Sequence, residues 1–238
     1  FSQNFATATN SYNTAVGSSA GGAVTTGVQN TIIGGLAGDA LTDADHNVAI
    51  GYAALTADTL GSRSVAIGNG ALSTQNFTTA TATYNTAVGD AAGGAVTTGT
   101  NNTLIGGLAG DAITDADFNV AVGYNSLGST TTGDLNVAIG SDALSTNVAG
   151  DRNVAIGNNA LSNMNPSGNV DTYNVAVGLN AGITVTTGVR NTMVGGLSGD
   201  SITTSNDNTL IGYQAGGSSD DGASNTALGS DAMAGGNF

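Results

Sequence analysis

Few side chains in this sequence could take part in acid–base or nucleophilic chemistry. The 238 residues include one histidine and no cysteine; all 17 acidic residues are aspartates and all three basic residues are arginines. A catalytic triad would have to be built around His46 alone. His46 comes directly before a recurring Asn, where other copies of the same pattern carry Tyr, Gln, Arg, Phe, Leu, Asp or Ser. We expect this position to be variable and exposed, and we expect no catalytic residues.

Two acidic stretches could bind calcium. The segments GGLAGDALTDAD (34–45) and GGLAGDAITDAD (106–117) each place three carboxylates within seven residues, at Asp39, Asp43 and Asp45 and at Asp111, Asp115 and Asp117. Clustered carboxylates are ligands that Ca²⁺ accepts. In the third copy of the stretch Asp200 remains, but Thr204 and Asn206 replace the other two acids. We expect solvated acidic turns and no cofactor, with calcium at the two complete clusters as the alternative.

The aromatic residues are better candidates for a binding surface. Tyr12, Tyr84 and Tyr173 each end a segment that departs from the surrounding pattern, and Phe5 and Phe77 precede two of them. Exposed aromatic rings on a rigid scaffold can stack on sugars or contact a protein receptor. The alternative is that these rings cover the interior where a longer segment bulges. We predict Phe5, Tyr12, Phe77, Tyr84 and Tyr173 as contact residues for a cell-surface glycan or protein.

A short motif repeats along the whole chain and must position these residues. It reads Asn, then Thr or Val, then a small or aliphatic residue, then Val, Ile or Leu, then Gly, and it occurs 13 times. Ten of the 12 spacings are 17 residues and two are 21, which divides the chain into blocks starting near Tyr12, Tyr84 and Tyr173. The four extra residues of each long spacing fall in the segments Phe77–Tyr84 and Met164–Tyr173. We expect their four extra residues to project as loops, where binding usually resides.

A 17-residue period suits one coil of a β-solenoid. We therefore predict an all-β fold, a parallel β-solenoid or β-roll of about 13 coils. Stacked at the strand spacing of about 4.8 Å, such coils would span roughly 60 Å. Residues 1–238 are interpreted as a single solenoid segment. Because the sequence begins at Phe1 and not at Met, we expect it to be part of a longer fibre.

Two columns of the motif predict structural roles. The β-branched residue before the motif Gly suits a buried strand, so we predict it to fill the core. This column contains Val16, Ile33, Ile50, Ile67, Val88, Ile105, Val122, Ile139, Ile156, Val177, Val194 and Ile211. The residue before it, Ala in nine copies, points the other way and is predicted to meet neighbouring chains.

The leading Asn of the motif is predicted to form a ladder of side-chain amides between coils, with support of the local turn as the alternative. The ladder contains Asn13, Asn30, Asn47, Asn85, Asn102, Asn119, Asn136, Asn153, Asn174, Asn191, Asn208 and Asn225, and Ser64 replaces Asn in the remaining copy.

Composition and charge exclude several classes of partner. The net charge of −14 argues against binding of nucleic acid or an anionic membrane, since both need basic patches. No apolar run approaches the ~20 residues of a membrane span. With 38 Gly and neither Lys nor Glu, helix is disfavoured. The regular recurrence of β-branched residues along the sequence argues against disorder.

The runs NVAIGNNAL, SVAIGNGAL and NTAVGDAAG resemble the head repeats of trimeric autotransporter adhesins, and similar runs occur in bacteriophage tail fibres. The resemblance covers nearly the whole chain, although its 17-residue period is slightly longer than is usual for adhesin heads. It implies a left-handed parallel β-roll with three parallel chains, so the expected partners include two further copies of this chain.

We expect an extracellular fibre segment that gives rigid length and multivalent contact with a receptor or surface. A phage tail fibre on the virion surface is favoured over a bacterial adhesin on the cell surface, because the copies are so uniform and no coiled-coil stalk or anchor is present in this sequence. The alternatives are the adhesin head and a purely structural spacer. A polysaccharide-degrading enzyme is least favoured, because Lys is absent and His is single.

Overall fold

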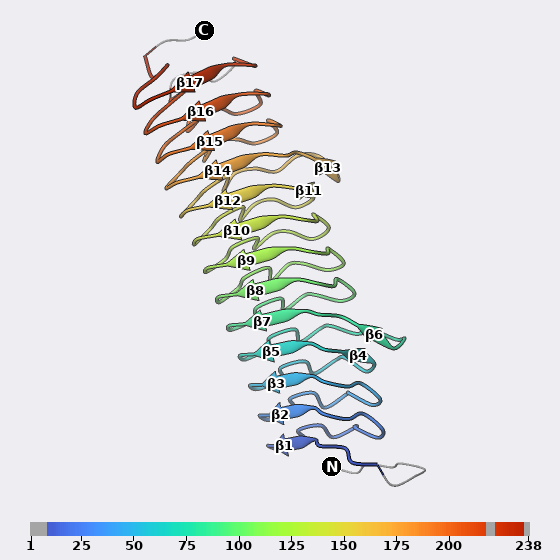
Figure 1. The fold of residues 1–238 in the computed structure, drawn as a ribbon. Coiled ribbons are helices and arrows are strands. Elements are labelled where there is room, and N and C mark those ends of the chain that lie inside the picture. The colour runs from blue at the N-terminus through green and yellow to red at the C-terminus, as the bar shows by residue number, and fades with distance from the viewer. Residues whose placement is uncertain (1–8, 218–221, 236–238) are drawn as a thin grey trace. The chain divides into compact units, whose positions relative to one another are not determined.

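The computed structural model describes residues 9–217 and 222–235. Within these residues the chain is all-β and contains no helix, and it forms a parallel β-solenoid of about 12 turns (Figure 1). Each of the 13 motif copies forms a strand of three residues. The chain divides into two compact units, Phe1–Asp117 and Phe118–Phe238, which are built from the same coil.

In the first unit, six motif strands pair in chain order. They are β1 (Thr14–Val16), β2 (Thr31–Ile33), β3 (Val48–Ile50), β5 (Val65–Ile67), β7 (Thr86–Val88) and β8 (Thr103–Ile105). Every pair is parallel and in register, so that each motif residue lies beside its equivalent in the next coil. The predicted repeat is therefore the structural repeat of this unit.

The second unit continues the same pattern with seven strands. They are β9 (Val120–Val122), β10 (Val137–Ile139), β12 (Val154–Ile156), β14 (Val175–Val177), β15 (Thr192–Val194), β16 (Thr209–Ile211) and β17 (Thr226–Leu228). Their pairing is again parallel and in register.

Each 21-residue coil adds a second, smaller sheet. In the first unit β4 (Gly61–Ser62) pairs with β6 (Thr81–Ala82), and in the second β11 (Gly150–Asp151) pairs with β13 (Val170–Asp171). Figure 1 shows that β6 and β13 reach farther out than the coils next to them. The extra residues therefore project, as their number predicted, and they are held by main-chain pairing. We call residues 78–82 the first lobe and residues 167–171 the second lobe.

The assignment of the two strand faces from the sequence was wrong. The middle residue of each strand points into the coil: Ala49, Ala138 and Leu104 are all fully buried. The predicted core column points outward instead. Val16 is 59% exposed and Ile139 38% exposed, and the equivalent residues of other strands are half-buried or exposed. The same result corrects the prediction that the Ala column meets neighbouring chains, because that column lies inside its own coil.

The interior explains why Ala is common in the middle of the strand. In most coils where that residue is Ala, a buried leucine four residues after the motif Gly supplies the bulk, as Leu55, Leu72 and Leu144 do. Where the strand residue is large, glycine takes the leucine position. A Cβ on Gly110 would lie 2.7 Å from Leu104, and one on Gly216 would lie 2.6 Å from Leu210. A large strand residue therefore leaves no room for a side chain at the glycine position, while a second large residue such as Ile113 is buried elsewhere in the same coil.

The motif glycines make the tightest approach between coils. Gly123 and Gly140 have φ values of 135° and 130°. A Cβ on Gly123 would lie 2.6 Å from the carbonyl carbon of Gly140. A side chain is therefore excluded both by the backbone conformation and by the next coil.

The asparagine column links successive coils, but mostly through the main chain. The amide oxygen of Asn30 accepts a hydrogen bond from the main-chain nitrogen of Asn47 at 2.9 Å, and Asn30 Nδ2 donates to the carbonyl oxygen of Ala44 at 2.8 Å. A direct amide–amide bond joins Asn153 Nδ2 to Asn136 Oδ1 at 3.0 Å. Most of these side chains are fully buried, so each bond satisfies a polar group that would otherwise be unpaired. The ladder is thus present, although its amides mainly pair with backbone.

Candidate binding surface

The predicted aromatic residues divide between surface and core. Tyr12, Tyr84 and Tyr173 are 71%, 56% and 49% exposed, which fits the predicted contact role. Phe77 does not fit it, because only 7% of this residue is exposed and it covers the interior beside the first lobe. Phe5 lies outside the described residues. The alternative that an aromatic residue covers the bulge therefore holds for Phe77 but not for the tyrosines.

The three tyrosines belong to one column with an unusual backbone. The residue directly before the motif Asn (or Ser64) is left-handed in every coil, with φ between 49° and 67°. In the first unit this column contains Tyr12, Gln29, His46, Arg63, Tyr84 and Asn101. In the second unit it contains Phe118, Leu135, Arg152, Tyr173, Arg190, Asp207 and Ser224. All of these residues except Asn101 are exposed, and we call this column the left-handed column.

The left-handed column contains large side chains where glycine would be the least strained residue. A left-handed conformation costs a non-glycine residue about 1 kcal/mol. Another left-handed column, four residues after the motif Gly, contains glycine in seven of its 13 positions. The column before the motif Asn contains none, yet it carries every arginine of the chain and the single histidine. The side chains of this column are therefore not explained by backbone conformation.

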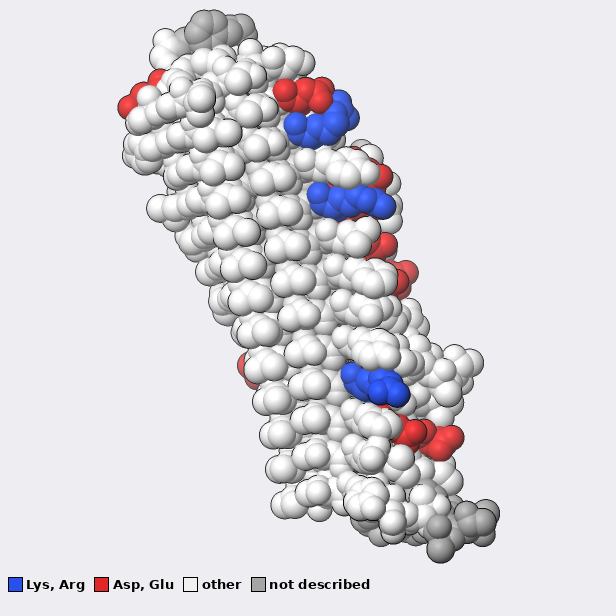
Figure 2. Space-filling model, in the orientation of Figure 1, with Lys and Arg blue, Asp and Glu red and all other residues white. Residues whose placement is uncertain are grey.

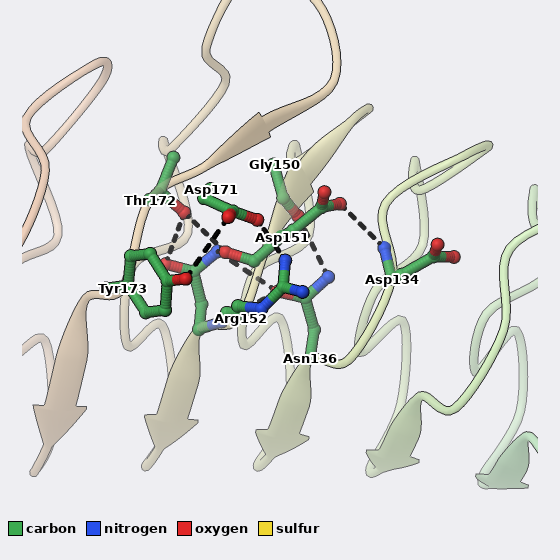
Figure 3. Close-up of polar contacts among 9 residues, drawn as sticks. Asp134, Asn136, Gly150, Asp151, Arg152, Asp171, Thr172 and Tyr173 are labelled. Atoms are coloured by element: carbon green, nitrogen blue, oxygen red, sulfur yellow. Dashed lines mark hydrogen bonds and ion pairs between the residues drawn. The ribbon is translucent and has the colours of Figure 1, made fainter.

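At the second lobe, three side chains of different chemistry meet (Figure 3). Arg152 Nη1 donates to Asp171 Oδ1, and Tyr173 OH donates to Asp171 Oδ2 at 3.1 Å. The Arg152 Cζ lies 5.8 Å from the centre of the Tyr173 ring. Asp171 comes from β13, whereas Arg152 and Tyr173 come from the left-handed column. The projecting strand thus delivers the carboxylate that pairs with both.

A second carboxylate fixes the backbone beneath this cluster. Asp151 in β11 is buried, and its Oδ1 accepts a hydrogen bond from the main-chain nitrogen of Asp134 at 2.8 Å. Burial raises the pKa of Asp151 above its ordinary value of 3.8, and the nearby charges of Asp134 and Asp171 raise it further. The hydrogen bond from Asp134 and the charge of Arg152 oppose this rise. Asp151 therefore acts as a structural acceptor that holds two coils together.

The next coil adds a second ion pair. Arg190 Nε and Nη2 donate to Asp207 Oδ1 and Oδ2 at 2.6 and 2.9 Å. Figure 2 shows aspartates next to the arginines on the drawn face. The surface beside the second lobe is therefore rich in hydrogen-bond donors and acceptors, and both of its arginines are paired with aspartates.

The first lobe has a simpler version of the same arrangement. The Arg63 Cζ lies 5.9 Å from the centre of the Tyr84 ring. Ala82 takes the place of Asp171, and Ser62 takes the place of Asp151. No ion pair of Arg63 is found among the described residues. The two lobes thus form a natural comparison, one with a carboxylate beside the Arg–Tyr pair and one without it.

Beneath the first lobe lies a buried polar network that the spacing of the motif does not predict. Gln75 Nε2 donates to Asp58 Oδ2 at 2.6 Å and to Ser64 Oγ at 2.8 Å. Gln75 Oε1 accepts from Asn85 Nδ2 at 2.9 Å. Gln75 therefore extends the asparagine ladder across the coil where Ser64 replaces Asn.

The aspartate clusters do not converge on one point. Asp45 Oδ1 accepts from the main-chain nitrogen of Val28 at 2.7 Å, and Asp39 Oδ1 accepts from Thr56 Oγ1 at 2.5 Å. In the second cluster Asp117 Oδ1 accepts from the main-chain nitrogen of Thr100 at 2.6 Å. Among the described residues, no group of three or more His, Cys, Asp or Glu side chains could hold a metal ion. Asp39, Asp45 and Asp117 thus connect neighbouring coils.

In the part of the chain that the structure describes, no helix is long and apolar enough to cross a membrane. No family model, curated protein or solved structure matches the chain.

Proposed function

We propose that this chain is a structural and adhesive segment of an extracellular fibre, a bacteriophage tail fibre, in which three parallel copies assemble side by side. The fibre gives rigid length and presents the lobes several times, so that weak contacts with a bacterial surface add together. The left-handed coil and the trimer rest on the resemblance of the repeats to adhesin heads and phage fibres. An adhesin head or a structural spacer would use the same coil.

The observation that carries this proposal is the outward face of the motif strands. Its two columns, one residue and three residues before each motif Gly, contain only Val, Ile, Leu and Thr. Single exposed apolar residues are common, but contiguous apolar patches usually mark an interaction site. A parallel copy presents the same side chains at the same spacing, so it can cover this face in register.

The charge distribution agrees with an interface at this face. Three copies carry a net charge of −42, three times −14, which opposes close packing. No aspartate lies in the two outward columns of the strands, whereas Asp171 and Asp207 lie at the lobe and in the left-handed column. Assembly through the strand face therefore places no charge of these columns between the copies.

Adjacent residues on opposite strand faces test the assembly. Ile139→Asp puts a carboxylate on the outward face, so we expect it to convert trimers to folded monomers. Ala138→Asp buries an unpaired carboxylate in the coil, so we expect it to lose the β-sheet circular dichroism signal. Sedimentation equilibrium gives the assembly state. A wild-type chain that stays monomeric, or an Ile139→Asp variant that stays trimeric, would contradict the proposed interface.

Deletion of the lobes tests the adhesive role. Removing residues 78–81 and 167–170 restores the 17-residue period without touching Phe77, Met164 or the tyrosines. We expect labelled wild-type chain to bind bacterial cells in a panel of strains, and the deleted chain to bind at least tenfold less while remaining folded. Equal binding by both chains would support the spacer interpretation.

A further inference from the structure

We infer that the surface beside the second lobe binds an extended, uncharged polysaccharide. We call this surface the polar strip and define it as Arg152, Asp171, Tyr173, Arg190 and Asp207. The inference rests on the adhesive role proposed above and names the ligand class and the residues that would recognise it.

The side chains of the strip match the functional groups of a sugar. Arg152 and Arg190 present planar groups of N–H donors, and Asp171 and Asp207 present paired acceptors. Adjacent hydroxyls of a sugar can pair with such two-atom groups in the bidentate manner of Arg and carboxylate. Tyr173 is 49% exposed and offers an aromatic ring for the apolar face of the sugar.

The charge of the strip selects against ionic ligands. Both arginines are already paired with aspartates, and the chain as a whole carries −14. An anionic polymer would meet a repulsive field and no unpaired arginine in the strip. A cationic ligand would have to displace arginine from two aspartates. A neutral, hydroxyl-rich ligand meets neither obstacle, because hydroxyls can donate to the carboxylates and accept from the guanidinium groups.

The geometry favours a chain over a small molecule. No pocket lies within the described residues, so a single sugar would be covered on one side only. Arg152, Tyr173, Arg190 and Asp207 stand at the same position of successive coils, about 4.8 Å apart. A polymer lying along this column can make one weak contact per coil. The strip has one aromatic ring among four charged side chains, whereas the core of a typical protein–protein interface is depleted in charged residues.

Native affinity electrophoresis of the full chain tests the inference. The gels contain dextran, mannan, a β-glucan or a galactan, and polygalacturonate serves as the anionic polymer. We expect at least one neutral polysaccharide to retard the chain and polygalacturonate not to. Tyr173→Ala should weaken retardation about three- to tenfold through loss of stacking. Tyr173→Phe should keep most of the retardation, and Arg190→Ala should lose it in part.

Ser224→Ala is the matched control, since Ser224 occupies the left-handed column outside the strip and should change nothing. Thermal unfolding of each variant checks that the fold is intact. Retardation by polygalacturonate alone, or equal retardation of the wild type and Tyr173→Ala, would overturn the inference.

If no polysaccharide of the panel retards the chain, the cells to which it binds are treated with periodate. Periodate cleaves the carbon–carbon bond between adjacent hydroxyls and so destroys sugar rings that carry them. We expect cell binding to fall at least tenfold and to depend on Tyr173. Binding that resists periodate would point to a protein receptor; the fibre proposal would then stand and the glycan inference would fail. Absence of cell binding by the wild type would instead remove the adhesive role itself.

Discussion

Arg190 and Asp207 stand at the same position of successive coils, and the guanidinium donates to both carboxylate oxygens at 2.6 and 2.9 Å. This pairing lowers the pKa of Asp207 below 3.8 and raises that of Arg190 above its ordinary value. The pair therefore contributes stability above pH 3.8, which is lost as the pH falls through the lower pKa of the folded state. Both groups are exposed, so we expect a small effect that salt weakens.

Chemical denaturation between pH 2 and 5 measures this contribution. In the Asp207→Asn variant, the free energy of unfolding should lack the salt-sensitive part of its fall at acid pH. Above pH 5 it should depend on pH as it does in the wild type. An acid decline identical in both proteins would show that the pair contributes nothing to folding.

The buried Asp151 should have the opposite pH dependence. Its pKa is raised, so between 3.8 and that raised pKa the folded state binds more protons than the unfolded state. Stability attributable to Asp151 therefore increases as the pH falls from neutral through the raised pKa, and levels off below 3.8. The Asp151→Asn variant should lose this increase. Asp142→Asn changes a partly exposed aspartate with no comparable burial and serves as the control.

Asp200 occupies the same position in its coil as Asp39 does in the first acidic stretch, and a substitution can give it a hydrogen-bond partner. Among the described residues, the buried Asp200 Oδ1 has no hydrogen-bond partner, and burial raises the pKa of Asp200. Asp39 avoids this because Thr56, 17 residues later, donates to its carboxylate at 2.5 Å. Gly217 stands 17 residues after Asp200, and a Cβ there would lie 3.2 Å from Asp200 Oδ1.

We expect Gly217→Thr to stabilise the second unit by about 1 kcal/mol, seen as a higher melting temperature. Gly217→Ala adds the Cβ without the hydroxyl and separates the hydrogen bond from the loss of glycine flexibility. A threonine variant no more stable than the alanine variant would contradict the proposed bond.

The complementary sizes of the strand residue and the residue four positions after the motif Gly predict strong coupling. Leu144→Gly should leave a cavity and cost about 2–5 kcal/mol, and Ala138→Leu should overpack the coil by about 1–3 kcal/mol. The double variant reproduces the natural pair of Leu104 and Gly110. We expect it to be more stable than the sum of the single effects by at least about 1 kcal/mol. Additive effects in urea denaturation would refute this account of the core.

Alanine substitution of two motif glycines can distinguish the cost of backbone strain from the cost of a clash between coils. Gly140 and Gly229 both have positive φ, at 130° and 120°. A Cβ on Gly140 would lie 2.5 Å from the carbonyl oxygen of Gly157, whereas no atom of the described residues lies within 4 Å of one on Gly229. Gly140→Ala should therefore abolish folding of the second unit, and Gly229→Ala should cost about 1–2 kcal/mol. Similar melting temperatures for the two variants would mean that strain alone fixes these glycines.

The 17-residue coil, the parallel pairing and the projecting lobes follow from the spacing of the motif. The direction of each strand face does not, because a three-residue strand that is apolar on both sides gives no signal of which side is inside. Ala138 and Ile139 differ in size, and the usual preference for β-branched residues in buried strands points to Ile139. That preference fails here because Leu144 of the return leg is buried in the same interior, and the small Ala138 leaves room for it.

At the candidate surface, the tyrosines were predictable from the insertions, whereas their partners were not. Arg152 and Asp171 are 19 residues apart, a separation that matches neither spacing of the repeat. The contact exists because β13 returns beside β11 after the insertion. Phe77 and Tyr84 flank the first lobe, yet one is buried and the other exposed, because only Tyr84 belongs to the left-handed column.

The alternation of Ala–Leu coils with coils that carry a glycine has a consequence for how such a chain can evolve. Tyr12 and Tyr84 are 72 residues apart, whereas Tyr84 and Tyr173 are 89 apart, a difference of one 17-residue coil. The longer block contains three consecutive Ala–Leu coils, starting at Ala121, Ala138 and Ala155, where the shorter block has two. Such a coil fits above and below another of its kind, so gene duplication can insert one without disturbing the packing on either side. Selection can therefore change the separation of the lobes along the sequence in whole coils while the residues of each lobe stay the same.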